Sequence, residues 1–219
     1  MPDLTLIIGN KNYSSWSLRP WVFMKQNQIP FDEKRVALFT HTTNTELSQY
    51  NSDFKVPVLK DGDLIIWDSL SILEYLSETY LNSNGWPRNV QTRALARSMS
   101  AEMHSGFFNL RNELPMNCRK KFHDIHLTSA AKNEITRVTD LWRKYRSEFG
   151  ADGEWLFGNY SIADAMFAPV ALRFYGYNIP LGTIETAYVE SVLNQPCIIE
   201  WIEAAKLEKE IIEDDEIKI

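Results

Sequence analysis

The apolar pattern of the chain changes near residue 85, and this change limits the folds that the chain can adopt. Before that point, short apolar runs with the period of a strand alternate with runs of helical period. After it, apolar residues recur at spacings of three and four, and no strand pattern stands out. The sequence therefore predicts an α/β domain over residues 1–81, a linker over 82–88 with Asn, Ser, Gly and Pro, and an all-α helical domain over 89–219.

The N-terminal domain is predicted to contain its elements in the order βαβαββα. A parallel βαβ unit followed by a hairpin and a closing helix forms an α/β layer with helices on its faces. We expect Pro20 in the first turn of its helix, because an interior proline removes a backbone hydrogen bond. The segments are expected at residues 4–9 (strand), 18–28 (helix), 31–38 (strand), 43–51 (short helix or turn), 56–67 (hairpin around Asp61 and Gly62) and 69–81 (helix).

Four helices are predicted in the second domain. The first has an apolar seam that ends before Pro115, and the second is closed by Gly150. The third begins at Ser161, where Asp164 is expected to reach back to the backbone N–H of Ser161 in a capping box. The fourth follows Pro196. We expect the capping box to serve folding rather than chemistry.

Composition excludes several classes of protein. With 44% hydrophobic and 24% charged residues the chain is predicted to be globular, and it has no apolar run near the roughly 20 residues that span a bilayer. Cys118 and Cys197 are its only cysteines, and they predict neither a disulfide framework nor a zinc site. The N-terminal residues lack the basic start of a secretory signal, so we expect a cytoplasmic location and no membrane partner.

The charge of the chain is concentrated at its C-terminal end. The formal net charge is −6, and residues 200–219 hold eight acidic residues against three lysines. The rest of the chain is therefore almost neutral, which argues against nucleic acid as a partner, because phosphates require a basic face. The acidic tail is expected to be a solvated helix end.

The stretch NYSSWSLRPW, residues 12–21, places three serine hydroxyls between an apolar strand and a helix. One hydroxyl is sufficient to cap the helix. Ser14, Ser15 and Ser17 are therefore either all cap and turn residues, or one of them is available to a ligand.

Several motifs together resemble the cytosolic glutathione transferase family. They are the order of elements, the serine corner before SLRPW, the segment VPVL, the DS pair that opens a helix, and SIAD in the helical half. The corner SSWSLR is most similar to the serine-type zeta branch, which includes maleylacetoacetate isomerase, although Trp16 stands where that branch has cysteine. The resemblance implies a thioredoxin-like N-terminal domain that holds glutathione, a helical C-terminal domain that borders a second-substrate pocket, and a homodimer.

The resemblance also implies which serine meets the glutathione sulfur. By its position relative to Arg19, Ser14 matches the catalytic serine of the family, and Ser15 is the alternative. A thiol with a pKa of about 8.5 is only a few per cent thiolate at neutral pH. A hydroxyl that donates to the thiolate stabilises it by roughly 1.5 to 3 kcal/mol, which lowers the thiol pKa by about one to two units.

Two further stretches match the glutathione-binding positions of the family. The resemblance implies a cis bond before Pro57, which turns the backbone of Val56 toward the cysteinyl backbone of glutathione. Lys55 is placed at the glycyl carboxylate, where His41 is a further candidate; the alternative for His41 is a surface loop.

The DS pair supplies the remaining glutathione contacts that the resemblance implies. Ser69 and the free N–H groups of its helix would hold the γ-glutamyl carboxylate, and Asp68 would face the ammonium group. The family commonly has Glu at the place of Asp68. His104, Phe108 and Arg111 are the candidates for the second-substrate pocket, with His104 and Arg111 suited to an anionic or polar co-substrate.

The sequence thus predicts a glutathione transferase-like enzyme that activates the thiol of glutathione, its co-substrate, and adds it to a small electrophile. No metal is expected. One alternative is a glutathione-dependent cis-trans isomerase of the maleylacetoacetate type, in which the thiolate adds and then leaves. Another is a non-enzymatic interaction or regulatory module with the same fold.

Overall fold

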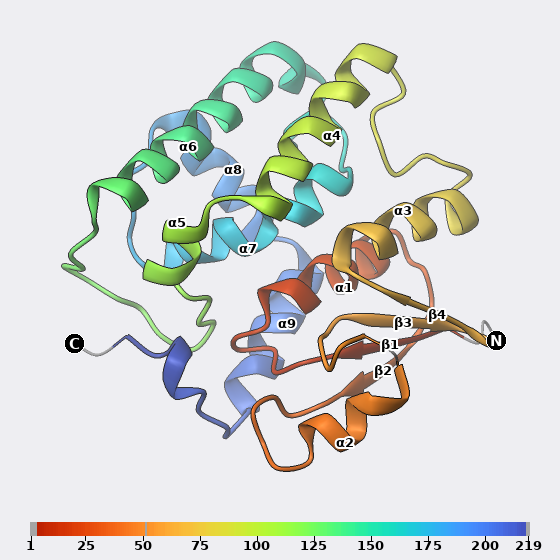
Figure 1. Ribbon diagram of the computed structural model, residues 1–219. Coiled ribbons are helices and arrows are strands. Elements are labelled where there is room, and N and C mark those ends of the chain that lie inside the picture. Colours follow the sequence, from red (N-terminus) through yellow and green to blue (C-terminus); the bar gives the residue numbers. More distant parts are fainter. Residues whose placement is uncertain (1–3, 51, 218–219) are drawn as a thin grey trace.

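The structure, a computed structural model, describes residues 4–50 and 52–217 (Figure 1). Residues 1–3, Asn51 and residues 218–219 lie outside it, including the last residue of the predicted segment 43–51. A four-stranded sheet has the order β2-β1-β3-β4, with β2 parallel to β1 and the other neighbours antiparallel. The strands are β1 (Leu4–Ile8), β2 (Asp32–Arg35), β3 (Val58–Asp61) and β4 (Leu64–Trp67).

Helices cover the sheet and form the rest of the molecule. The predicted order βαβαββα is confirmed, and so is the helical second half. The helices are α1 (Ser15–Gln26), α2 (Thr43–Leu47) and α3 (Ser69–Tyr80) beside the sheet, followed by α4 (Val90–Ser105), α5 (Phe108–Glu113), α6 (Ser129–Phe149), α7 (Ile162–Gly176), α8 (Thr183–Leu193) and α9 (Pro196–Leu207), with 3-10 turns at Ser48–Tyr50, Gly150–Asp152 and Glu213–Asp215.

The alternation of side chains along β1 separates two apolar clusters. Leu6 and Ile8 point into the larger cluster, which continues from α1 and α3 into the helical half. Ile7 points to the other face and packs with Val58 in a small cluster that α2 covers. Figure 1 shows α1 and α3 on one face of the sheet and α2 on the other. The larger cluster joins both halves of the chain around α1 and α7.

Local signals in the sequence located several elements correctly. The hairpin forms around Asp61 and Gly62, with Asp61 paired to Leu64 across a two-residue turn and Gly62 at a φ of 56°. At the start of α7 the predicted capping box is present: the carboxylate of Asp164 accepts the backbone N–H of Ser161 at 2.9 Å. Both predictions are confirmed because each depends on residues only three or four apart.

Two helix predictions were wrong. Ser14 caps α1, so the helix begins at Ser15 and Pro20 lies inside it, beyond the first turn. The first helix of the second half is broken after Ser105, because Gly106 is extended and Phe107 is left-handed with a φ of 56°. The second half therefore contains both α4 and α5 where one helix was expected, and α8 was missed as well.

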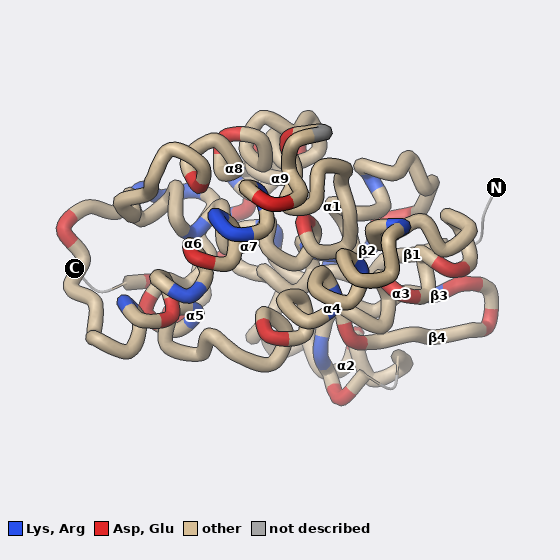
Figure 2. Tube along the Cα trace, turned by 90° about the horizontal axis from the view of Figure 1, so that it is seen from above, with Lys and Arg blue, Asp and Glu red and all other residues tan. Residues whose placement is uncertain are grey.

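The charged residues are distributed over the whole trace, with Lys and Arg interspersed among Asp and Glu (Figure 2). Among the described residues, no helix has both the length and the apolar character needed to cross a membrane.

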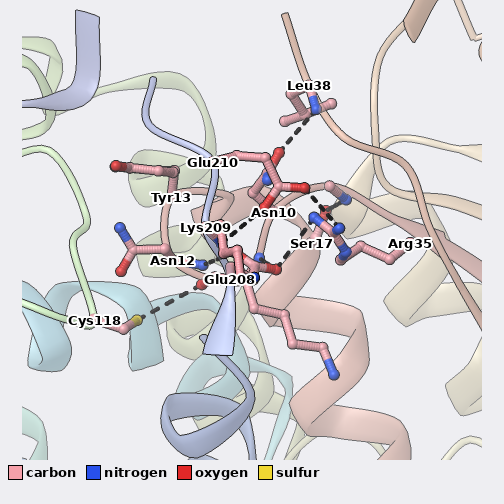
Figure 3. A network of polar contacts seen from close by, with 12 residues as sticks. Asn10, Asn12, Tyr13, Ser17, Arg35, Leu38, Cys118, Glu208, Lys209 and Glu210 are labelled. Atoms are coloured by element: carbon pink, nitrogen blue, oxygen red, sulfur yellow. Dashed lines mark hydrogen bonds and ion pairs between the residues drawn. The ribbon is translucent and has the colours of Figure 1, made fainter. Parts of the chain in front are cut away.

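The acidic C-terminal segment is not a solvated helix end, contrary to expectation. Helix α9 ends at Leu207, and the following residues return to the loop between β1 and α1 (Figure 3). The carboxylate of Glu208 is 7% exposed and accepts the backbone N–H groups of Lys11 at 2.7 Å and Asn12 at 3.1 Å. Arg119 donates to the carbonyl oxygen of Glu208 at 2.7 Å. The tail therefore braces the loop that leads into the serine corner.

Replacing Glu208 by alanine is expected to lower the free energy of unfolding by about 2 kcal/mol, because two buried N–H groups lose their acceptor. Urea unfolding followed by circular dichroism measures the change. The matched control is Glu203→Ala, since Glu203 is exposed and, among the described residues, pairs with Lys206 alone. This variant should change stability by less than about 0.5 kcal/mol. Equal stability of the two variants would contradict the bracing role.

Candidate active site

The serine corner, Ser14, Ser15 and Ser17, lies after the end of β1, at the start of α1. Ser14 is the N-cap of α1: its Oγ accepts the N–H of Ser17 at 3.3 Å and donates to the Oγ of Ser17 at 2.8 Å. The Oγ of Ser17 in turn accepts the N–H of Gly9 at 3.1 Å. The hydroxyls of Ser14 and Ser17 thus stabilise the backbone between β1 and α1.

Ser15 makes a different contact. Its Oγ accepts a hydrogen bond from Nη2 of Arg173 at 3.2 Å, across the boundary between the two halves of the chain. Arg173 is on α7 and only 5% exposed, and its Nε donates to the carbonyl oxygen of Leu114 at 2.7 Å. The side chain of Arg173 is therefore fixed at both ends of its guanidinium group.

A cavity of about 830 Å³ opens at this corner, lined by residues of both halves. Five of the predicted site residues line it: Ser14, Ser15, Lys55, Val56 and Arg111. The other lining residues are Tyr13, Trp16, Leu38, Phe39, Thr40, Thr43, Asn44, Phe54, Asn112, Pro115, Met116, Arg173 and Asp215. The hydroxyls of one half thus face the arginines of the other across a space that can hold a small molecule.

The DS pair lies at the start of α3. Asp68 has a φ of 75°, and its Oδ1 caps the helix by accepting the N–H groups of Leu70 at 3.0 Å and Ser71 at 3.1 Å. Its Oδ2 lies 3.0 Å from Nε2 of His104. Ser69 is buried, and its Oγ accepts a bond of 3.5 Å from Nη1 of Arg19.

The sheet, the serine corner and the polar N-terminus of α3 lie in a part of the chain that is similar to known proteins. A family model described as the glutathione S-transferase N-terminal domain matches residues 13–79. Residues 13–79 are thus similar to the N-terminal domain of glutathione S-transferases. The matched range contains the serine corner, the hairpin and the DS pair.

Curated relatives match a part of the chain of similar length. Glutathione S-transferase theta-3 from Mus musculus is 38% identical over 87 residues, which cover 39% of this chain and 36% of the relative. The match thus spans about a third of the length of the curated relatives. Their theta class differs from the zeta branch that the serine corner resembles, so the branch stays a prediction.

Two solved structures match almost the whole chain. A glutathione transferase homologue from Burkholderia with bound glutathione has a TM-score of 0.69 at 22% identity and covers 93% of this chain and 98% of its own. An unclassified glutathione S-transferase from Bombyx mori has a TM-score of 0.73 at 17% identity, with 93% and 94% covered. The whole chain therefore has the glutathione S-transferase fold.

Within the matched residues 13–79, the segment before β3 has the expected backbone. The bond between Val56 and Pro57 is cis, and Val56 lines the cavity. Nζ of the exposed Lys55 lies 2.8 Å from Oδ2 of Asp53. His41 is exposed and does not line the cavity.

The three residues predicted for a second-substrate pocket of the glutathione S-transferase fold lie in different places. Arg111 lines the cavity, with its guanidinium carbon 5.1 Å from the ring centre of Trp16. Phe108 is 59% exposed and is not among the lining residues. His104 also lies outside the lining, where it pairs with Asp68 and meets the ring of Trp16 edge-on.

Three guanidinium groups surround the corner of this glutathione S-transferase fold. Burial, together with the neighbouring charges of Arg173 and Arg111, lowers the pKa of Arg19 to about 9. Burial and then Arg111 lower the pKa of Arg173 to about 10. Both groups remain charged at neutral pH, so the corner has a positive potential that favours an anion such as a thiolate.

Sequence reasoning missed Arg173, Tyr13 and Asp215 as parts of the site. Arg173 had a visible signal, because it is the charged residue in the apolar run AMFAPVALRF. Tyr13 had one as well, because it directly precedes Ser14 in the stretch NYSSWSLRPW. Asp215 had none, since the tail that places it at the cavity returns from far along the chain.

Proposed function

We propose that this protein is a glutathione transferase: it binds glutathione at the N-terminal ends of α1 and α3, ionises the thiol at the serine corner and adds it to a small electrophile. The single observation that supports this most is the cavity that brings Ser14, Ser15 and Val56 together with Arg111 and Arg173. The γ-glutamyl end would meet Asp68 and Ser69, and the glycyl carboxylate would meet Lys55, with His41 as a further candidate.

The chemistry follows from the charge of the corner. The N-terminus of α1 stabilises a nearby anion by about 0.3 to 1 kcal/mol. A hydroxyl donor adds roughly 1.5 to 3 kcal/mol. At the upper ends of these ranges the two terms lower the thiol pKa by about three units, which makes the thiolate the main species of bound glutathione at neutral pH. Catalysis then consists of thiol ionisation and positioning of the electrophile.

A calorimetric titration with glutathione tests the proposal, followed by conjugation assays over a broad panel of electrophiles. We expect saturable binding and an enzyme-dependent loss of at least one electrophile. If the protein did not bind glutathione at millimolar concentration, the proposed function would be wrong. Binding without turnover of any electrophile would favour the interaction module instead.

A second candidate is the glutathione-dependent isomerisation of an anionic substrate. The observation that favours it is the pair of arginines, Arg111 and Arg173, in the cavity, since guanidinium groups suit a carboxylate. In that reaction the thiolate adds to the substrate and leaves again, so glutathione is not consumed. Product analysis distinguishes the two reactions, because conjugation consumes one glutathione for each turnover.

We also propose that the protein is a cytoplasmic homodimer that needs no metal. These three properties rest on the family resemblance and the composition. Light scattering of the purified protein tests the oligomeric state. A chelator is expected to leave activity unchanged.

A further inference from the structure

The hydroxyl of Ser14 is already engaged at both its oxygen and its proton. The oxygen caps α1, and the proton goes to Oγ of Ser17. Ser17 is fully buried and also holds the N–H of Gly9. For Ser14 to donate to a ligand, this chain of bonds at the corner has to be rearranged.

The hydroxyl of Ser15 is engaged only at its oxygen. It accepts from the guanidinium of Arg173, and the structure shows no acceptor for its proton among the described residues. A hydroxyl that accepts from a cation is polarised, which makes its O–H a stronger donor. Ser15 is also the first residue of the twelve-residue helix α1 and lines the cavity.

The guanidinium of Arg173 faces one carboxylate in the cavity, that of Asp215, which attracts it without forming an ion pair. Within the part of the chain that the structure describes, Nη1 of Arg173 has no hydrogen-bond partner. Its Nε donates to the carbonyl oxygen of Leu114, and its Nη2 donates to Oγ of Ser15. A thiolate bound against Ser15 would therefore place a negative charge closer to this guanidinium than an unpaired Asp215 does.

We propose that Ser15 is the hydroxyl that donates to the glutathione sulfur and that Arg173, from the helical half, is its positioning residue. This inference rests on the proposed function. On ionisation the S–H proton leaves to solvent, while Ser15 keeps its own proton and shares it with the thiolate. The sulfur lone pair then forms the bond to the electrophile, which either expels a leaving group with its electron pair or opens a π bond that takes up a proton from solvent. The helical half thus contributes to thiol activation as well as to the pocket.

The ultraviolet absorbance of the thiolate, measured against pH in the complex with glutathione, tests the proposal. The full-length wild type is compared with Ser15→Ala, Ser14→Ala, Arg173→Met and Arg173→Lys. We expect Ser15→Ala to raise the pKa of the bound thiol by about one to two units, and Ser14→Ala to raise it less. Arg173→Met is expected to raise it as well, and Arg173→Lys should restore part of the change because lysine keeps the charge.

The double variant Ser15→Ala/Arg173→Met separates positioning from an independent effect. If Arg173 acts through Ser15, the double variant shifts the thiol pKa by less than the sum of the single shifts. A fully additive shift would overturn the role of Arg173. An unchanged pKa in Ser15→Ala beside a raised one in Ser14→Ala would overturn the role of Ser15. Failure of the wild type to bind glutathione would overturn the proposed function and this inference with it.

Discussion

Replacement of Asp164 by alanine is expected to lower the free energy of unfolding by about 3 kcal/mol, because three buried donors lose their acceptor. The carboxylate is 1% exposed. It accepts the N–H of Leu156 at 3.0 Å, the N–H of Ser161 at 2.9 Å and the Oγ of Ser161 at 3.1 Å. It therefore joins the loop before α7 to the first turn of the helix that runs through the larger core.

Urea unfolding of Asp164→Ala beside Asp140→Ala measures this effect. Asp140 lies on the exposed face of α6, and its ion-pair partner in the described part of the chain is Arg143, three residues further on. Its loss should change stability by less than about 0.5 kcal/mol. A midpoint for Asp164→Ala close to that of Asp140→Ala would show that the three donors find other partners when the carboxylate is removed.

The elements that the sequence predicted correctly are those whose determinants are close together in the chain. The Asp61–Gly62 turn and the Ser161–Asp164 cap each depend on a few neighbouring residues. The break between α4 and α5 was missed because Phe107 continues the apolar spacing of the helix. The signal there was Gly106, where a side chain would approach the carbonyl oxygen of Glu102 to 2.8 Å.

Contacts between distant parts of the chain explain what sequence reasoning could not reach in the candidate site. Ser15 and Arg173 are 158 residues apart, and Lys11 and Glu208 are 197 apart. No local motif encodes either pair, because each forms only when the helical half and the tail pack on the serine corner. The resemblance correctly anticipated the cis bond before Pro57. Arg111, which it assigned to a second-substrate pocket, lines the cavity, but the resemblance gave no reason to single out Arg173.

The variant Asp68→Asn is expected to bind glutathione about tenfold more weakly than the wild type, a change of about 1.4 kcal/mol in binding free energy. Asparagine keeps an oxygen for the N–H groups of Leu70 and Ser71, and it tolerates the left-handed backbone of this position. It removes the negative charge that would face the ammonium group of glutathione. Calorimetric titration measures the affinity.

The variant Asp68→Ala separates the charge of this residue from its cap. Alanine removes the acceptor of two helix N–H groups and is disfavoured at a φ of 75°, so its free energy of unfolding should fall by about 2 kcal/mol. The asparagine variant keeps the cap and loses the charge that faces His104 at a partly exposed pair and that attracts Arg19, and should stay within about 1 kcal/mol of the wild type. If both variants bound glutathione as the wild type does, Asp68 would be a helix cap alone. We expect both variants to bind glutathione more weakly, and only Asp68→Ala to be destabilised. That result would mean that the carboxylate of Asp68 caps α3 with one oxygen and binds glutathione through its charge.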